Sequence, residues 1–273
     1  MDMRKNLMNA RRSRRMKAYQ AILIIICLVL TSQAYSYEGY DKEPMKGNVI
    51  FPLTAVDVKL SEISILVGRR QYRGESIKVA AEYMLENLSS KEINFKMGFA
   101  VDSYVIVIGS DTKMPDDFKV SVNNRTVKTS TSKIMSKYFV TYRQGKTAAE
   151  KREIPLIMWE ISFKPKEKKI ITTTYTMEWL LDPGGQSLEL DLSRLYLWKG
   201  NIDKAYFRVA LTDDLIDDIK AKDPSRWPQI SIEPPKYKIK DHALEWFFKD
   251  LKKEKINDIS IDVNYRKPGV VGD

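Results

Sequence analysis

The chain has 273 residues, 43% of them hydrophobic, and a formal net charge of +10. This hydrophobic content is enough for a packed core and excludes wholesale disorder, and the length fits one large domain or two modest ones. Cys27 is the only cysteine, so a chain that loses its first 36 residues has no thiol nucleophile, thiolate metal site or disulfide.

Residues 1–36 have the pattern of a secretory signal peptide. A basic segment from Arg11 to Lys17 precedes ten apolar residues, Ala21 to Leu30, and small residues follow. We therefore expect export from the cytoplasm, with cleavage after Ala34 or Ser36. The alternative is an uncleaved N-terminal membrane anchor, although ten apolar residues fall short of the roughly 20 that span a bilayer.

The leader also accounts for most of the net charge. Seven of the 46 basic residues and one of the 36 acidic residues lie in 1–36, which leaves 39 basic and 35 acidic residues, a net charge of +4. A nucleic-acid partner is therefore not expected.

Alternating apolar residues predict β-strands through the first half of the chain, after a polar lead-in at 37–48. A change of phase near Ser61 and Glu62 indicates a bulge, and Asn123-Asn124 is typical of a hairpin turn. Pro165 to Glu167 predicts a turn into a long final strand. The expected strands cover about residues 56–67, 77–85, 93–99, 118–127, 138–142, 157–163 and 169–179.

The second half continues as β structure with one short helix. Acidic residues early and lysines late predict that helix over 213–222, before Asp223-Pro224. Residues 243–251 fit a strand or a helical stripe, and the surrounding pattern favours the strand. Further strands are expected at about 188–192, 205–211 and 259–263.

Turn residues at Asp182 to Ser187 predict a domain boundary, with Pro183 and Gly184 suited to a type II turn. We therefore expect an all-β chain with two β-sandwich-like domains in tandem. The larger domain covers 49–182, and a smaller C-terminal domain, which contains the helix, covers 186–267.

Several stretches together resemble a family of secreted bacterial β-sandwich proteins of unassigned function. They are Ala81 to Ser89 before Met97 to Val101, Phe163 to Lys169 before Thr174-Tyr175, and Tyr196 before Trp198 to Ile202. The resemblance covers about residues 50–265 and departs from the usual Phe-Pro at Phe99-Ala100. It implies export and fold, and it carries over no catalytic residue and no cofactor.

Few residues suggest catalysis. His242 is the only histidine, so a histidine-based triad or a multi-histidine metal site would depend on it alone, and its polar neighbours indicate a surface position. The acidic residues of 213–218 lack the spacing of a calcium loop. Trp227, in a polar loop, is the one tryptophan that we expect as a possible ligand contact. No cofactor or metal is expected.

The segment from Arg125 to Glu153 carries eight basic and two acidic residues. We expect much of it to be a solvated hairpin tip and loop. One interpretation is a solvated segment without a partner. The other is a contact with an anionic envelope surface, either lipid headgroups or a wall polymer, through Lys133, Lys137, Arg143 and Lys146.

The sequence thus predicts an exported, non-catalytic protein with a binding or structural role at the cell envelope. The alternative is a hydrolase of envelope polymers that uses paired carboxylates, for which the spacing favours no particular pair.

Overall fold

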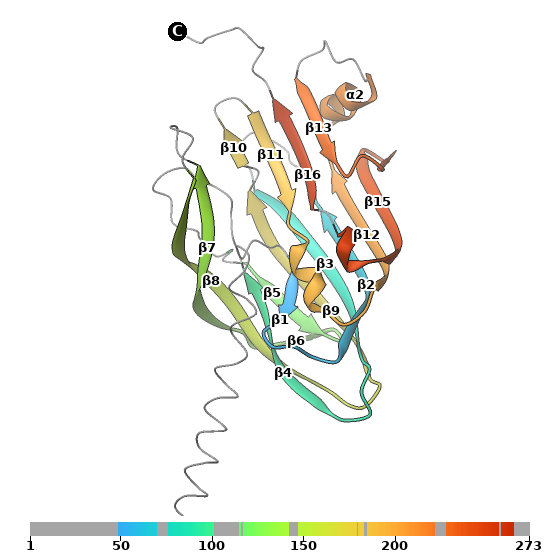
Figure 1. The fold of residues 1–273 in the computed structure, drawn as a ribbon. Helices are drawn as coiled ribbons and strands as arrows, with labels where there is room; N and C mark the ends of the chain where they lie inside the picture. The colour runs from blue at the N-terminus through green and yellow to red at the C-terminus, as the bar shows by residue number, and fades with distance from the viewer. Residues whose placement is uncertain are drawn as a thin grey trace, which may run out of the picture. The chain divides into compact units, whose positions relative to one another are not determined.

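A computed structural model describes residues 49–69, 76–100, 115, 117–141, 147–178, 180–182, 185–221, 228–256 and 258–264. These residues form three β-sheets and one α-helix, α2 (Asp213–Ala221), as Figure 1 shows. The expectation of an all-β, sandwich-like fold with one short helix is confirmed. The predicted signal peptide and lead-in lie outside the described residues.

The largest sheet has eight strands in the order β14-β15-β12-β2-β3-β9-β5-β6. Neighbours pair antiparallel except β12 and β2, which are parallel. Its strands are β2 (Val58–Val67), β3 (Ser76–Asn87), β5 (Lys119–Val122), β6 (Arg125–Thr126), β9 (Lys168–Glu178), β12 (Ile202–Ala210), β14 (Lys238–Lys240) and β15 (Ala243–Leu251).

Two four-stranded sheets complete the fold. The first has the order β1-β4-β8-β7, with β1 (Ile50–Pro52), β4 (Ile93–Ala100), β7 (Ser130–Thr141) and β8 (Thr147–Phe163). The second has the order β10-β11-β16-β13, with β10 (Leu180–Asp182), β11 (Gly185–Leu190), β13 (Gln229–Glu233) and β16 (Ile259–Asn264). Short 3₁₀ helices, η1 (Ser193–Leu197) and η2 (Lys253–Lys255), follow β11 and β15.

One hydrophobic cluster includes residues of all three sheets, because alternate residues of strands such as β2, β12 and β16 face inward. Its aromatic part joins the first four-stranded sheet to the eight-stranded one, with the Phe99 and Tyr175 ring centroids 4.9 Å apart. Tyr83, Phe95, Trp159 and Tyr175, which lie on strands that the alternation predicted, are all buried. The same cluster includes Phe207 and Trp246 from the second half of the chain.

Local sequence signals located several elements correctly. The register of β2 against β3 shifts between Leu60 and Glu62, where the sequence predicted a bulge. Asn123 and Asn124 have φ of 49° and 63° and connect β5 to β6, as expected for a turn of the type that hairpins favour. Residues 243–251 form a strand, and the predicted helix begins at Asp213.

The prediction of two tandem domains, 49–182 and 186–267, requires correction. Lys204 to Val209 of β12 pair in parallel with Glu62 to Val67 of β2, so strands from both sides of the predicted boundary share one sheet. The described residues from both sides of the predicted boundary accordingly belong to one compact unit. The strands on either side of the predicted boundary, β10 and β11, pair antiparallel, with Asp182 opposite Gly185.

The basic segment also differs from the expected loop. Residues 130–141 and 147–163 form the long antiparallel hairpin β7–β8, in which Ser130 pairs with Met158 and Thr141 with Thr147. Among the helices that the structure describes, none has the length and apolar character needed to cross a membrane.

Candidate functional site

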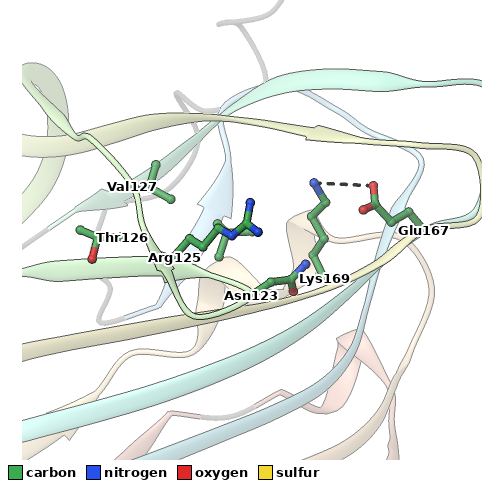
Figure 2. Close-up of a pocket in the computed structure, with 7 residues that line it drawn as sticks. Asn123, Arg125, Thr126, Val127, Glu167 and Lys169 are labelled. Atoms are coloured by element: carbon green, nitrogen blue, oxygen red, sulfur yellow. Dashed lines mark ion pairs between the residues drawn. The ribbon is translucent and has the colours of Figure 1, made fainter.

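A pocket of about 500 Å³ lies at the end of the eight-stranded sheet where the β5–β6 hairpin meets the start of β9 (Figure 2). Its volume is within the range of about 300–1,000 Å³ that is usual for small-molecule sites. It is lined by Val122, Asn123, Arg125, Thr126, Val127, Glu167 and Lys169.

The hairpin that carries Arg125 is held firmly against β9. The Asn123 backbone N–H donates to the Ile170 carbonyl at 2.8 Å, and the Ile170 N–H donates to Asn123 Oδ1 at 2.9 Å. Val127 N–H donates to the Val120 carbonyl at 3.1 Å. Because backbone hydrogen bonds fix both sides of this turn, Arg125 projects from a rigid position.

Strand alternation in β9 turns the Lys169 side chain toward the core. Lys169 lies on the same face of the strand as Ile171, Thr173 and Tyr175, all of which face the core. Its side chain is only 16% exposed, and its ammonium lies 5.4 Å from the centroid of the buried Phe163 ring. A lysine that faces inward at the end of a sandwich places its charge beside the opening while its methylene chain covers the core.

Glu167 belongs to the turn that connects β8 to β9. Lys164 N–H donates to Glu167 Oε2 at 2.7 Å, and Lys166 adopts φ of 59°. The buried Asn87 side chain anchors this turn, since its amide donates to the Lys164 carbonyl at 2.9 Å and to the Lys91 carbonyl at 2.8 Å. The carboxylate of Glu167 is therefore oriented mainly by backbone groups.

The charges of the pocket do not balance. Lys169 Nζ lies 3.6 Å from Glu167 Oε2, a long ion pair, and that oxygen already accepts from Lys164 N–H. Within the described part of the chain, no carboxylate pairs with Arg125. Figure 2 shows the Arg125 and Lys169 side chains extending toward the same space. Two cations with one carboxylate favour an anionic ligand between them.

The floor of the pocket is apolar. Val122 and Val127 are partly buried and pack against the hydrophobic core. A ligand with a small hydrocarbon part and an anionic group would match this combination of apolar floor and cationic walls. Over the described residues, no group of three histidine, cysteine or acidic side chains is arranged to hold a metal ion.

The structure does not bring the residues predicted for an anionic surface into this pocket. Lys133 lies exposed on β7, where it pairs in register with Pro155, and Lys137 lies on the same strand opposite Lys151. Arg143, Lys146 and Trp227 lie outside the described residues. The anionic-surface contact and the Trp227 contact therefore stay predictions.

His242 is a surface residue, as expected, with a 63% exposed side chain. Its Nδ1 lies 2.6 Å from Asp213 Oδ1, which also pairs with Arg69 at 3.2 Å. Trp159, Trp198 and Trp246 are buried in the core.

We did not select Arg125, Glu167 or Lys169 as site residues from the sequence. A signal for Lys169 was present, because the strand alternation that turns Tyr175 inward also turns Lys169 inward. The approach of Arg125 to Lys169 had no local signal, since it depends on β5 pairing with β9 across about 50 residues of chain.

No family model and no curated protein matches the chain. Among solved structures, the fold is similar to that of a candidate nutrient binding protein from Legionella pneumophila, with a TM-score of 0.56 and 17% sequence identity. The match covers 80% of this chain and 70% of that chain, and at this identity it shows the fold alone. An M1 zinc metallopeptidase from Deinococcus radiodurans aligns with a TM-score of only 0.32 and 9% identity, over 77% of this chain and 42% of that chain.

Proposed function

We propose that this protein is an exported, non-catalytic binding protein of the cell envelope whose pocket at Arg125 and Lys169 takes a small organic anion. The ligand class is a carboxylate or phosphate ester with a short apolar part. Export rests on the predicted signal peptide in residues 1–36.

The observation that carries the proposal is the charge arrangement of the pocket. Arg125 presents a planar guanidinium that can donate two parallel hydrogen bonds to one carboxylate or phosphate. Lys169 adds an ammonium on a side chain that is only 16% exposed, so its attraction to an anion is less screened by water than that of a fully exposed lysine. Glu167 offsets one of these two charges, so the bound anion would bring the site close to neutrality.

The fold supports this proposal at a coarser level. A solved structure of similar fold is described as a candidate nutrient binding protein, which is consistent with a binding role for this chain. The rival proposal, hydrolysis through paired carboxylates, needs two acidic side chains that flank one bond. The pocket is lined by a single carboxylate, that of Glu167.

The test is a ligand panel on the mature protein. We expect organic anions such as succinate, citrate and glycerol phosphate to raise the melting temperature, whereas matched neutral compounds do not. A ligand at 100 times its Kd stabilises a protein by about 2.7 kcal/mol, which a thermal shift resolves. Calorimetry then gives the affinity of each hit.

Two variants localise the binding. Arg125→Ala and Lys169→Met should each weaken it about tenfold or more, since a hydrogen bond to a charged group contributes roughly 1.5–3 kcal/mol. Lys128→Ala is the matched control, because it removes an exposed cation three residues from Arg125 that does not line the pocket. Equal loss in all three variants, or no anion binding at all, would rule out the pocket.

A contact with an anionic envelope surface through Lys133, Lys137, Arg143 and Lys146 is a separate part of the proposal. Basic residues near an anionic bilayer contribute about 1 kcal/mol each, an effect that fades within a Debye length of about 8 Å. The mature protein should therefore co-sediment with anionic vesicles or wall material at low salt and be released at high salt. Binding that ignores salt, or that survives charge reversal of these four residues, argues against this contact.

A further inference from the structure

The Glu167 carboxylate has one oxygen that the fold uses and one that it leaves available. Oε2 accepts from Lys164 N–H at 2.7 Å and lies 3.6 Å from Lys169 Nζ. Within the described part of the chain, no donor contacts Oε1. Figure 2 shows the carboxylate turned toward Lys169, at the wall of the pocket. Because an ionised carboxylate accepts through both oxygens, Oε1 is an acceptor that a ligand can use.

The Asn123 side chain offers a neutral donor to the same pocket. Its Oδ1 accepts from Ile170 N–H at 2.9 Å, and this contact identifies the oxygen end of the amide, because an N–H cannot donate to an NH₂ group. Asn123 N–H also donates to the Ile170 carbonyl at 2.8 Å, so the backbone is held in place as well. Among the residues that the structure describes, no acceptor contacts Nδ2. The amide therefore keeps its N–H donors for a ligand.

The charges around the pocket favour an anion over a zwitterion. Two lysines of the adjoining turn are engaged elsewhere, since Lys166 Nζ donates to the Leu88 carbonyl and Lys168 Nζ lies 3.3 Å from Glu86. The exposed charges on neighbouring segments that do not line the pocket are Lys91, Glu92, Lys119, Lys128 and Lys164. These residues add net positive charge, so the potential at the pocket attracts an anionic group and repels an additional cation.

We propose that the ligand of this pocket is a 2-hydroxy carboxylic acid, and that Glu167 is the residue that selects its hydroxyl group. This inference rests on the anion site proposed above. The ligand carboxylate accepts from Arg125, Lys169 and the Asn123 amide, and the hydroxyl group donates to Glu167 Oε1. The hydrocarbon part of the acid lies on Val122 and Val127.

The position of Lys169 explains why the hydroxyl group must be close to the carboxylate. Its ammonium lies beside Glu167 and also contacts the bound anion, so the group that donates to Glu167 is a near neighbour of that anion. A hydroxyl on carbon 2 meets this condition. An acid without the hydroxyl would displace water from Oε1 and give no hydrogen bond in return. An amino acid would place its ammonium beside that of Lys169, where the two like charges repel.

The experiment compares three acids that share one carbon skeleton. They are 2-hydroxy-4-methylpentanoate as separate enantiomers, 4-methylpentanoate and leucine, and calorimetry on the mature protein gives a Kd for each. We expect one enantiomer of the hydroxy acid to bind about tenfold or more tightly than the plain acid, as a hydrogen bond to a charged group provides. Leucine should bind more weakly than this hydroxy acid.

Glu167→Gln tests the residue that selects the hydroxyl group. The variant keeps an acceptor for Lys164 N–H and removes the negative charge. It should lower the preference for the hydroxy acid to about threefold or less, because a hydrogen bond between neutral groups is weaker than one to a carboxylate. Its affinity for 4-methylpentanoate should stay equal or rise, a result that a general loss of structure would not produce.

Asn123→Asp tests the amide donor. Aspartate keeps an acceptor for Ile170 N–H and tolerates positive φ, but it replaces the N–H donors with a carboxylate oxygen. Both acids should bind about tenfold or more weakly, and the preference between them should remain. Asn124→Asp is the matched control, because Asn124 is the adjacent turn residue, has φ of 63°, and does not line the pocket. It should bind both acids as the wild type does.

The possible failures distinguish this inference from the anion site itself. Equal binding of the hydroxy acid and the plain acid, or a preference unchanged in Glu167→Gln, overturns the selection by Glu167 and leaves the anion site intact. Tighter binding of leucine than of the hydroxy acid would assign Glu167 to an ammonium group instead. Equal losses in Asn123→Asp and Asn124→Asp would remove the amide from the site. No binding of any anion overturns both proposals.

Discussion

The two faces of the eight-stranded sheet differ most clearly at two phenylalanines on adjacent strands. Phe207 of β12 is fully buried and pairs in register with Trp246, whereas Phe247 of β15 is 56% exposed and pairs with Tyr206. One step along the strand moves a side chain from the core to solvent. The same residue type is therefore part of the core at one position and exposed to solvent at the other.

The pocket lies at the end of the buried face, where the core meets solvent. Lys169 faces inward like the other alternate residues of β9, but it lies at the open end of the sandwich. Its methylene chain continues the core and its ammonium reaches the pocket, so one residue serves packing and, in the proposed site, binding.

The largest expected effect comes from separating the halves of the chain. A fragment of residues 37–182 would lose β12, the neighbour of β2, together with β15, β14 and the β11–β16 pair. Because Ile63, Ile65 and Val67 would lose the core residues that cover them, we expect the fragment not to fold. Circular dichroism and amide NMR dispersion measure this. A dispersed, cooperative fragment would restore the tandem-domain interpretation.

The matched variants Phe207→Ala and Phe247→Ala compare how much a ring on the buried face and a ring on the exposed face of the sheet stabilise the fold. Removing the buried ring should cost about 3–5 kcal/mol of unfolding free energy. Removing the exposed ring should cost at most about 1 kcal/mol, the usual size of a cross-strand pair. Urea unfolding of both variants gives the two values. Similar losses of unfolding free energy in the two variants would mean that Phe247 does not lie on the exposed face of β15.

A smaller effect concerns how the stability of the fold depends on pH through Glu245, on the exposed face of the eight-stranded sheet. Partial burial raises the pKa of Glu245, but hydrogen bonds from Tyr206 and Arg208 outweigh this and hold the pKa below its usual value. A lowered folded-state pKa stabilises the fold above the unfolded pKa of about 4.3, and this contribution is lost as the pH falls through the folded value.

Melting curves of the wild type and Glu245→Gln at a series of pH values test this assignment. The wild type should lose its advantage over the variant below about pH 4, where the unfolded carboxylate also becomes protonated. Tyr206→Phe is the companion variant, since it removes one of the two hydrogen bonds to Glu245 and keeps the ring. A difference between wild type and Glu245→Gln that is constant with pH would contradict the lowered pKa.

Much of the fold was predictable because its signals are local. The phase change at Leu60 and Glu62 marks the bulge, and Asn123-Asn124 specifies a turn in which both residues have positive φ. The parallel pairing of β12 with β2 was missed, since it joins residues about 140 apart and leaves no pattern in either strand. The full length of β7–β8 was missed because its polar residues resemble those of a loop.

The site was less predictable than the fold. Lys169 could have been placed inward from the alternation of β9, but a pocket needs several such positions at once. Arg125 reaches Lys169 only because β5 returns to pair with Thr174 to Ile171.

The central claim is that Arg125 and Lys169 hold an organic anion together. The most direct measurement is an NMR titration of the mature protein with the anion that raises its melting temperature most, following the Arg125 Nε–H signal and the backbone amides. The account predicts saturable shifts at Arg125 Nε–H and at residues 122–127 and 167–169, with loss of these shifts in Lys169→Met. Saturable shifts confined to other strands, or shifts that persist in Lys169→Met, would contradict it.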